Sequence, residues 1–305
     1  MPESKPARSA GSVRCALATR LASKPRLDAS LLAVLILAAT PIGNLADASD
    51  RLKQAIEKSE HIACEDTRSF KQLASALGLR FHAKLYSLHE HNEKSRLDEL
   101  VEIARTHDLL VVSDAGMPTI SDPGFNLVRR CIDEQIEVSV IPGASSVLGA
   151  LAISGLPTDR FVFEGFLPRK KGERISVFRS LEDERRTMIF FEAPHRILDA
   201  LTDAGEVFGP EHQAVVVREL TKKFEEAVRG TIAELIQWAQ SEPKGEMVLL
   251  LAGVSRGEAD YESLAQQALN LAESGMGLKQ AVVEVAKVSG ASKSVIYEHA
   301  LKLKP

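Results

Sequence analysis

The sequence predicts an α/β protein made of two α/β domains and a small helical tail. Three observations support this fold class. Short apolar strands alternate with amphipathic helical segments, several strands end in Gly- or Pro-containing loops that lead into helices, and three short helical segments separated by glycines end the chain. A chain of 305 residues can hold two domains, each with its own core. We place the first domain at residues 31–157, the second at 158–255 and the helical tail at 256–305.

Composition and charge limit the classes of function. The chain is 45% hydrophobic and 26% charged, which is typical of a globular protein. A formal net charge of -4 argues against a globally basic DNA-packaging protein, but it is compatible with an enzyme that contacts RNA through local basic patches. Cys15, Cys64 and Cys131 are odd in number and lack a metal or disulfide spacing, so we expect a reducing, cytoplasmic location.

Residues 1–30 differ from the rest of the chain. They are rich in Ala, Ser and Arg and predict a disordered basic extension. Together with the apolar run at residues 31–39, they could also resemble a signal peptide. That run is too short to span a membrane, and it leads into a glycine loop and a helix as the later strands do. We therefore predict a buried first strand and no membrane association.

The first domain alternates strands and helices. We expect strands at residues 34–39, 61–63, 84–88, 109–112 and 137–141, and helices at 48–58, 94–106, 125–134 and 147–154. The run at 109–112 is short, β-branched and continuous, which indicates a strand buried on both faces. The strands ending at residues 39, 112 and 141 each lead through a small-residue loop into a helix. Because such loops meet at one edge of a doubly wound sheet, we predict a cofactor cavity there.

The loops carry neither a G-x-G-x-x-G pattern nor a P-loop lysine, which argues against a dinucleotide or nucleoside triphosphate. We expect backbone groups and apolar contacts to hold the ligand.

A carboxylate pair follows the strand at residues 61–63. Glu65 and Asp66 precede Arg68, and they could either serve chemistry or supply an N-cap with an ion pair. Because adjacent residues on an extended chain point oppositely, one should face the cavity while the other caps the next helix or pairs with Arg68. We choose Asp66 for the cavity, since its shorter side chain holds a position more rigidly.

Two histidines, His89 and His91, follow the strand at residues 84–88. An i, i+2 spacing on a strand places the two imidazoles on opposite sides, so we predict no metal site.

The second domain repeats the alternation. We expect strands at 161–166, 187–192, 214–218, 225–230 and 246–252, and helices near 174–181, 194–204 and 232–240. Its cationic segments, at residues 169–174 and 218–223, could each be a solvated surface or a contact for RNA phosphates across the cleft. In the tail, helices at 261–274, 278–289 and 292–303 are typical of a helix-turn-helix-like unit. Its balanced charges argue against a strong DNA reader.

Several motifs, in order, resemble one known family. They are Thr40-Pro41-Ile42-Gly43-Asn44-Leu45-Ala46-Asp47, Glu65-Asp66-Thr67-Arg68, His89-Glu90-His91-Asn92, Ser113-Asp114-Ala115-Gly116, Ser121-Asp122-Pro123-Gly124, Pro142-Gly143 and Arg218-Glu219-Leu220-Thr221-Lys222. The chain from about residue 31 to its end is similar to the bacterial small-subunit ribosomal RNA (cytidine-2′-O)-methyltransferases, a branch of the tetrapyrrole methylase superfamily. Met117 departs from the pattern, because the family usually has threonine there.

The resemblance implies a fold, a cofactor and a substrate. It implies two α/β domains of the tetrapyrrole methylase type, with S-adenosylmethionine bound between them, and a homodimer. The implied substrate is the ribose 2′-hydroxyl of a cytidine in small-subunit (16S) ribosomal RNA, alone or in the ribosomal subunit. Matching positions give the cofactor contacts Ile42, Gly43, Asp114, Ala115, Gly116, Ile120, Ser145, Ser146 and Glu192.

A ribose hydroxyl is a poor nucleophile, so we expect a general base. The candidates are Asp66, Glu65 and His89, and the candidates for holding RNA are Arg68, Arg169, Lys170, Lys171, Lys222 and Lys223. Two alternatives remain open. Another methyltransferase of the superfamily, for tetrapyrrole C-methylation or diphthine synthesis, should have a Gly-rich first loop and a Gly-Asp-Pro second loop, which this chain lacks. A non-catalytic nucleic-acid-binding protein would leave the three converging loops unexplained.

Overall fold

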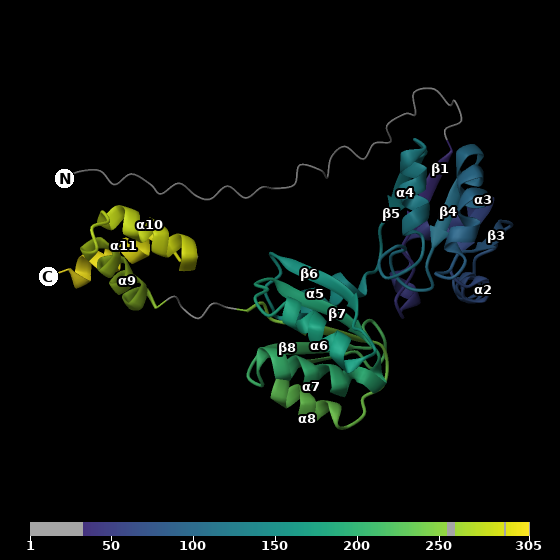
Figure 1. The fold of residues 1–305 in the computed structure, drawn as a ribbon. Coiled ribbons are helices and arrows are strands. Elements are labelled where there is room, and N and C mark those ends of the chain that lie inside the picture. The colour runs from purple at the N-terminus through teal and green to yellow at the C-terminus, as the bar shows by residue number, and fades with distance from the viewer. Residues whose placement is uncertain (1–32, 255–259, 290, 305) are drawn as a thin grey trace, which may run out of the picture.

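The computed structural model describes residues 33–254, 260–289 and 291–304. They form two helix-covered sheets and a group of three further helices (Figure 1). The predicted fold class is therefore confirmed. The basic extension predicted at residues 1–30 lies outside the described residues.

The first sheet has five parallel strands in the order β3-β2-β4-β1-β5. They are β1 (Val34–Ala38), β2 (His61–Cys64), β3 (Lys84–Ser87), β4 (Leu109–Val112) and β5 (Glu137–Ile141). Each lies where the sequence predicted a strand, to within one residue at its ends. All residues of β4 are buried, as its continuous apolar run predicted. The apolar run at residues 33–39 thus contains a strand of this sheet.

Helices cover both faces of the first sheet. They are α1 (Asp50–Lys58), α2 (Thr67–Ala76), α3 (Glu93–Thr106) and α4 (Phe125–Asp133), and the short 3₁₀ helix η1 (Leu45–Asp47) precedes α1. Because side chains alternate along a strand, Val111 packs on one face with residues of α3 and α4, whereas Leu110 packs on the other with residues of α1 and α2. The sheet is doubly wound, with all its strands' carboxyl ends at one edge.

The second sheet has five strands in the order β6-β7-β10-β8-β9, of which only the β6–β7 pair is parallel. They are β6 (Phe161–Phe166), β7 (Thr187–Glu192), β8 (Gln213–Arg218), β9 (Glu226–Thr231) and β10 (Met247–Leu251). One face packs against α6 (Lys171–Ser180), α7 (Ile197–Phe208) and α8 (Ile232–Ala239), with the 3₁₀ helix η2 (Pro194–Arg196) before α7. Phe178 and Phe190, both fully buried, meet edge to face in this core.

The helix α5 (Ser146–Ser154) covers the other face of the second sheet, where Leu151 packs with Ile189 and Leu250. This helix precedes residue 157, so it is in the first domain by chain order but contributes to the second domain's packing. The two sheets are thereby connected directly through α5.

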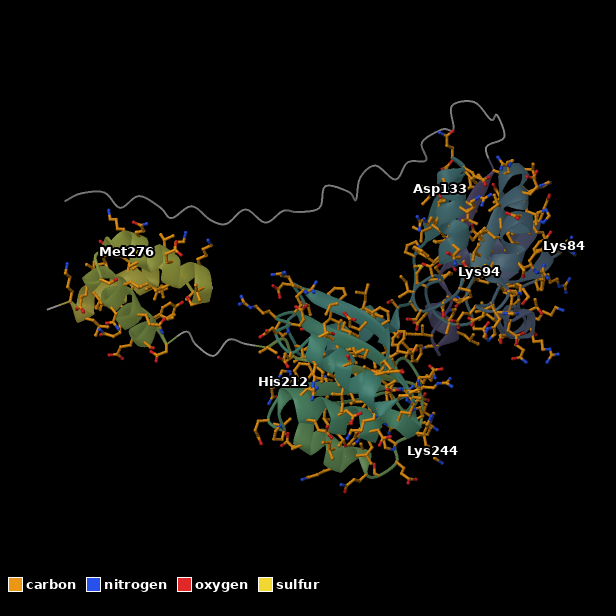
Figure 2. The ribbon with its side chains drawn as sticks, viewed as in Figure 1. Lys84, Lys94, Asp133, His212, Lys244 and Met276 are labelled. Carbon is orange, nitrogen blue, oxygen red and sulfur yellow. The ribbon has the colours of Figure 1, made fainter. Side chains whose placement is uncertain are left out.

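The tail consists of α9 (Tyr261–Glu273), α10 (Leu278–Ser289) and α11 (Lys293–Leu303). Ala268, Val282 and Ile296 are buried in a small core of their own, and Met276, labelled in Figure 2, packs against it. Among the described residues, none of the helices has the length and apolar character needed to cross a membrane.

Candidate functional site

A cavity of about 700 Å³ is lined by residues of both domains. Its volume is within the usual range for a small-molecule site. The wall contains eight of the nine predicted cofactor residues: Ile42, Asp114, Ala115, Gly116, Ile120, Ser145, Ser146 and Glu192. Gly43 does not line the cavity, but it is adjacent to the wall residue Lys222. A Cβ atom added to Gly43 would lie 2.5 Å from Cγ of Lys222. The loops that the sequence predicted to converge therefore do so at the carboxyl edge of the first sheet.

Two of these loops are joined by their backbones. The Thr40 N–H donates to the Gly116 carbonyl at 2.9 Å, and the Gly116 N–H donates to the Thr40 carbonyl at 3.2 Å. Gly116 has φ +82°, a left-handed conformation that side chains rarely adopt. The loops after β1 and β4 thus present a fixed backbone surface to the cavity.

The third loop begins the helix α5. The Ser145 hydroxyl accepts from the Leu148 N–H at 3.4 Å and caps the helix, and Ser145, Ser146 and Val147 line the cavity. The first turn of a helix carries unpaired N–H groups and a partial positive charge. This side of the cavity therefore favours a negatively charged group of a ligand.

Glu65 and Asp66 have the opposite orientation to the one we predicted. Glu65 lines the cavity, whereas Asp66 is exposed and caps α2, with its Oδ1 accepting the Arg68 N–H at 2.6 Å. The Asp66 N–H donates to Asp114 Oδ1 at 3.2 Å. The N-cap role dominates because the first turn of α2 needs an acceptor, and aspartate supplies one well. Burial, and next the charge of Asp114, raises the pKa of the Glu65 carboxyl.

Asp122 is a wall residue to which we had assigned no role. It is half-buried beside Glu65 and Asp114, and burial, together with the charges of those two carboxylates, raises its pKa to about 6. A hydrogen bond with Ser113 acts in the opposite direction. Asp122 lies in Ser121-Asp122-Pro123-Gly124, one of the motifs of the family resemblance, so that motif was the signal for its position.

Glu192 is the most deeply buried acid of the wall. Its Oε1 accepts the Ala193 N–H at 2.8 Å. Its Oε2 lies 3.3 Å from Arg196 Nη2, but that group donates instead to the carbonyls of Leu167 and Pro168 at 2.7 and 2.8 Å. The Glu192 Oε2 atom has no hydrogen-bond partner among the described residues, and burial raises the pKa of this carboxyl. An unsatisfied buried acceptor beside a cavity fits a ligand that donates a hydrogen bond.

His89 lies outside the cavity wall. Strand β3 ends at Ser87, so His89 and His91 lie in a turn instead of a strand, and their rings meet edge to face with centroids 6.1 Å apart. The reason we gave for opposite ring directions therefore does not apply. The His89 N–H donates to Asn92 Oδ1 at 2.8 Å, and its Nδ1 is buried without a hydrogen-bond partner in the described part of the chain.

The predicted RNA-binding cations differ in their surroundings. Lys222 lines the cavity and pairs with Glu219 and Glu246, both at 3.0 Å. Arg68, Arg169 and Lys223 are exposed. Lys170 and Lys171 are also exposed, with ion pairs to Glu173 at 2.9 Å and Glu206 at 2.7 Å.

Arg174, in the same basic segment, is buried and donates to Asp203 Oδ2 at 2.7 Å. Its charge is already compensated inside the protein, so this residue does not belong to an exposed basic patch.

The remaining wall residues give the cavity an apolar side. From the second domain come Phe166, Phe191 and Leu220, and from the first Met117, the position at which the sequence departs from the family pattern. These apolar residues belong to strands and loops whose pattern indicates only burial, so no separate sequence signal marks them as cavity residues. Met117 thus places a thioether in the wall.

Comparisons with known proteins agree with this architecture. Residues 34–236 match the family model described as tetrapyrrole (corrin/porphyrin) methylases. Residues 258–304 match the model described as the RsmI C-terminal HTH domain.

Among curated proteins, the chain is similar to ribosomal RNA small subunit methyltransferase I of Pasteurella multocida, with 41% identity covering 90% of this chain and 98% of the relative. The protein of the same name from Mycobacterium tuberculosis is 44% identical, covering 83% and 88%. Among solved structures, a uroporphyrin-III C-methyltransferase from Thermus thermophilus complexed with S-adenyl homocysteine has a TM-score of 0.51. It is 18% identical and the match covers 72% of this chain and 97% of that one, which indicates a shared fold.

Proposed function

Because the chain belongs to the tetrapyrrole (corrin/porphyrin) methylase family, and within it to the ribosomal RNA small subunit methyltransferase I proteins, we propose a specific reaction for it. It transfers a methyl group from S-adenosylmethionine to the ribose 2′-hydroxyl of a cytidine in small-subunit (16S) ribosomal RNA. The observation that carries the proposal is the cavity at the strand ends, whose wall contains eight of the nine positions assigned to the cofactor.

The residues of the cavity suit S-adenosylmethionine chemically. The first turn of α5, at Ser145 and Ser146, would receive the cofactor's carboxylate. The Oε2 atom of Glu192, which has no hydrogen-bond partner among the described residues, would accept a hydrogen bond from an amino group of the cofactor. Gly116 lets the ligand approach the backbone, and Phe166 and Leu220 give apolar contact.

When bound, S-adenosylmethionine supplies a methyl group on a positively charged sulfur. The protein's part is to hold the ribose oxygen in line with that methyl group and to accept the hydroxyl proton as the oxygen–carbon bond forms and the carbon–sulfur bond breaks. Positioning contributes about 7–11 kcal/mol to such reactions, and a general base about 10²–10⁴-fold in rate.

We assign the proton acceptor to Glu65. It lines the cavity, and its raised pKa makes it a stronger base than an exposed glutamate. Asp122 shares both properties and is the second candidate in the wall. Asp66 and His89, which we also considered, are outside the wall, and Asp66 already serves as an N-cap.

The assignment is tested by single-turnover methylation of small-subunit RNA. Glu65→Gln should slow the chemical step by about 10²-fold or more while cofactor affinity stays near that of the parent. Asp66→Asn is the matched control, because asparagine caps helices as well as aspartate does. If Asp66→Asn abolishes methylation and Glu65→Gln does not, Asp66 takes the role.

The activity itself is tested by mapping 2′-O-methylation on 16S ribosomal RNA from cells that lack the protein. One modified cytidine should disappear and return on complementation. An unchanged methylation map would reject the substrate.

Exposed cations would hold the RNA backbone. Lys170 and Lys223 are exposed on separate loops of the second domain. Neutralising both with Lys→Gln should reduce the slope of log affinity against log salt by about one for each charge removed. A slope equal to that of the parent would exclude these two lysines from phosphate contact.

The relatives support this reaction over the alternatives left open by the sequence. Their names specify ribosomal RNA, and the tail matches a domain model of the same family, whereas tetrapyrrole C-methylation or diphthine synthesis finds support only in the shared fold. A non-catalytic role does not account for the cavity.

We also propose a cytoplasmic homodimer. Exposed apolar side chains on α4, β5 and α5 (Phe125, Ile132, Val140 and Leu148) offer a surface for a second copy. Light scattering after gel filtration should give twice the chain mass, and a monomer at micromolar concentration would exclude the dimer.

A further inference from the structure

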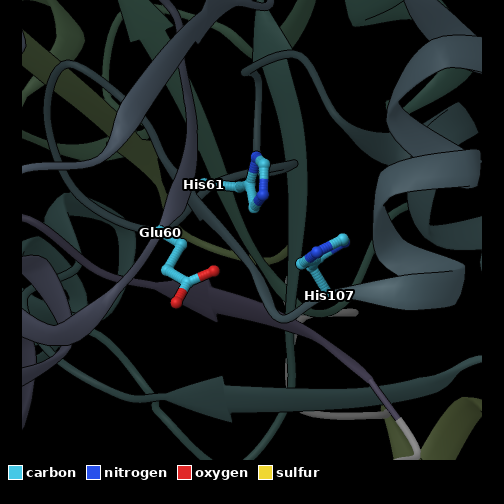
Figure 3. A group of neighbouring side chains, drawn as sticks. All are labelled: Glu60, His61 and His107. Atoms are coloured by element: carbon cyan, nitrogen blue, oxygen red, sulfur yellow. The ribbon is translucent and has the colours of Figure 1, made fainter.

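A group of potential metal ligands lies at the amino edge of the first sheet, opposite the cavity. Glu60 and His61 are at the start of β2, and His107 is between α3 and β4. One ligand atom of each side chain lies within 4.8 Å of those of the other two. Figure 3 shows the three side chains directed toward a shared space. Because β2 and β4 are adjacent parallel strands, the sheet holds together residues that are far apart in the sequence.

Both imidazoles are oriented by a hydrogen bond at the same ring atom. His61 Nδ1 is 2.8 Å from the hydroxyl of the buried Tyr86, and His107 Nδ1 is 2.9 Å from Thr106 Oγ1. Each bond engages Nδ1 and leaves Nε2 as the ligand atom. A second hydrogen bond of this kind is what fixes the ring of a metal-bound histidine and selects its tautomer.

We propose that Glu60, His61 and His107 bind one zinc-type divalent cation, through a carboxylate oxygen and two Nε2 atoms, with water completing a tetrahedral shell. Two imidazoles and one carboxylate are ligands that Zn²⁺ accepts. Mg²⁺ and Ca²⁺ prefer six or more oxygen ligands and do not suit this set.

To bind one ion, the three ligand atoms, now within 4.8 Å of one another, need to move only slightly closer together. Bonds of the usual length place the ligand atoms of a tetrahedral zinc ion roughly 3.4 Å apart. Glu60 is exposed, so its carboxylate can rotate toward the two imidazoles, which the contacts with Tyr86 and Thr106 hold in place. A bound ion would connect the amino ends of two neighbouring strands and would stabilise the folded state, because the unfolded chain does not bring these ligands together.

The test is zinc binding by the full-length protein in competition with a chromogenic chelator. The variants are His107→Ala, Glu60→Gln and, as a matched control, His91→Ala, which removes an exposed histidine at the opposite edge of the same sheet. His107 and Glu60 are exposed, so their replacement should leave the fold intact. Melting temperatures with ZnCl₂ or MgCl₂ give a second measurement that is independent of methylation.

The parent and His91→Ala should bind one zinc ion more than His107→Ala does. Glu60→Gln should bind that ion at least ten-fold more weakly. Zinc, but not magnesium, should raise the melting temperature of the parent and leave that of His107→Ala unchanged. Equal zinc stoichiometry and affinity in the parent and His107→Ala would overturn the site, as would full affinity in Glu60→Gln.

Discussion

Replacing Asp122 by asparagine should stabilise the protein at neutral pH. Asp122 lines the cavity beside Glu65 and Asp114, and its pKa rises from 3.8 to about 6 in the folded state. A carboxyl whose folded pKa is raised favours folding while it is protonated, and that contribution is lost as the pH rises through the folded pKa. At pH 7 the ionised Asp122 therefore opposes folding, and a rise from 3.8 to about 6 corresponds to about 3 kcal/mol.

Asparagine keeps the shape of Asp122 and does not titrate, so it removes this penalty. Partial exposure to solvent makes the full value an upper limit. A gain of this order should raise the melting temperature by roughly 5–10 °C. The difference between variant and parent should be largest above pH 6 and should disappear below about pH 3, where Asp122 is protonated in both the folded and unfolded states.

Thermal unfolding of parent and variant from pH 3 to pH 8 measures this difference. Asp98→Asn is the control, because the Asp98 side chain is 92% exposed and its replacement should change stability by less than about 0.5 kcal/mol. A variant that melts at the parental temperature at pH 7, or whose advantage does not depend on pH, would refute the argument. If Asp122→Asn is more stable but methylates more slowly, Asp122 contributes to the reaction and lowers the stability of the folded protein.

Two further predictions concern the cavity and the core. Gly116→Val should weaken S-adenosylmethionine binding, because Gly116 has φ +82° and its new Cβ would lie only 3.3 Å from Ile42 Cγ2; unchanged calorimetric affinity in a folded variant would contradict this. Arg174→Met should destabilise the protein by about 3–5 kcal/mol, because it leaves Asp203 buried without its main partner. Adding Asp203→Leu should restore part of the loss in urea unfolding, and a double variant as unstable as the single one would show that the buried charge is not the cause.

Most strands could be predicted because their apolar runs are short and bounded by loops, and β4 is the clearest case. Helix α2 was expected only as the next helix for one of the two carboxylates to cap, and no bounds were predicted for it although its signals were present. Phe70 and Ala74 are buried four residues apart, and Asp66 stands directly before the helix as its cap. We had assigned Asp66 to the cavity, and one side chain cannot serve both purposes. The helix required the acceptor, so Glu65 became the residue that faces the cavity.

Other features depend on tertiary packing and leave no local pattern. Helix α5 is apolar around most of its circumference, so its sequence does not indicate which sheet it covers, and only the structure shows Leu151 packed on the second sheet. Arg174 lies in a basic segment whose sequence predicts an exposed surface. It is nevertheless buried, because Asp203 on α7 compensates its charge. The ligand group of His61 and His107 likewise comes from two strand starts that adjoin only in the folded sheet.

The charge of the cavity wall suits the cofactor of the proposed reaction and disfavours the RNA backbone. Among the described residues, the wall contains six carboxylates and a single lysine, Lys222, which two of those carboxylates already neutralise. Such a wall attracts the positively charged sulfonium of the cofactor and repels phosphate. In the proposed reaction, the RNA backbone would therefore stay outside the cavity, with the exposed Lys170 and Lys223 as its predicted contacts, while only the target nucleoside enters. Burial, and then the charges of neighbouring carboxylates, raise the pKa of Glu65 and Asp122. In the proposed reaction, those carboxylates would also limit which part of the RNA reaches the base.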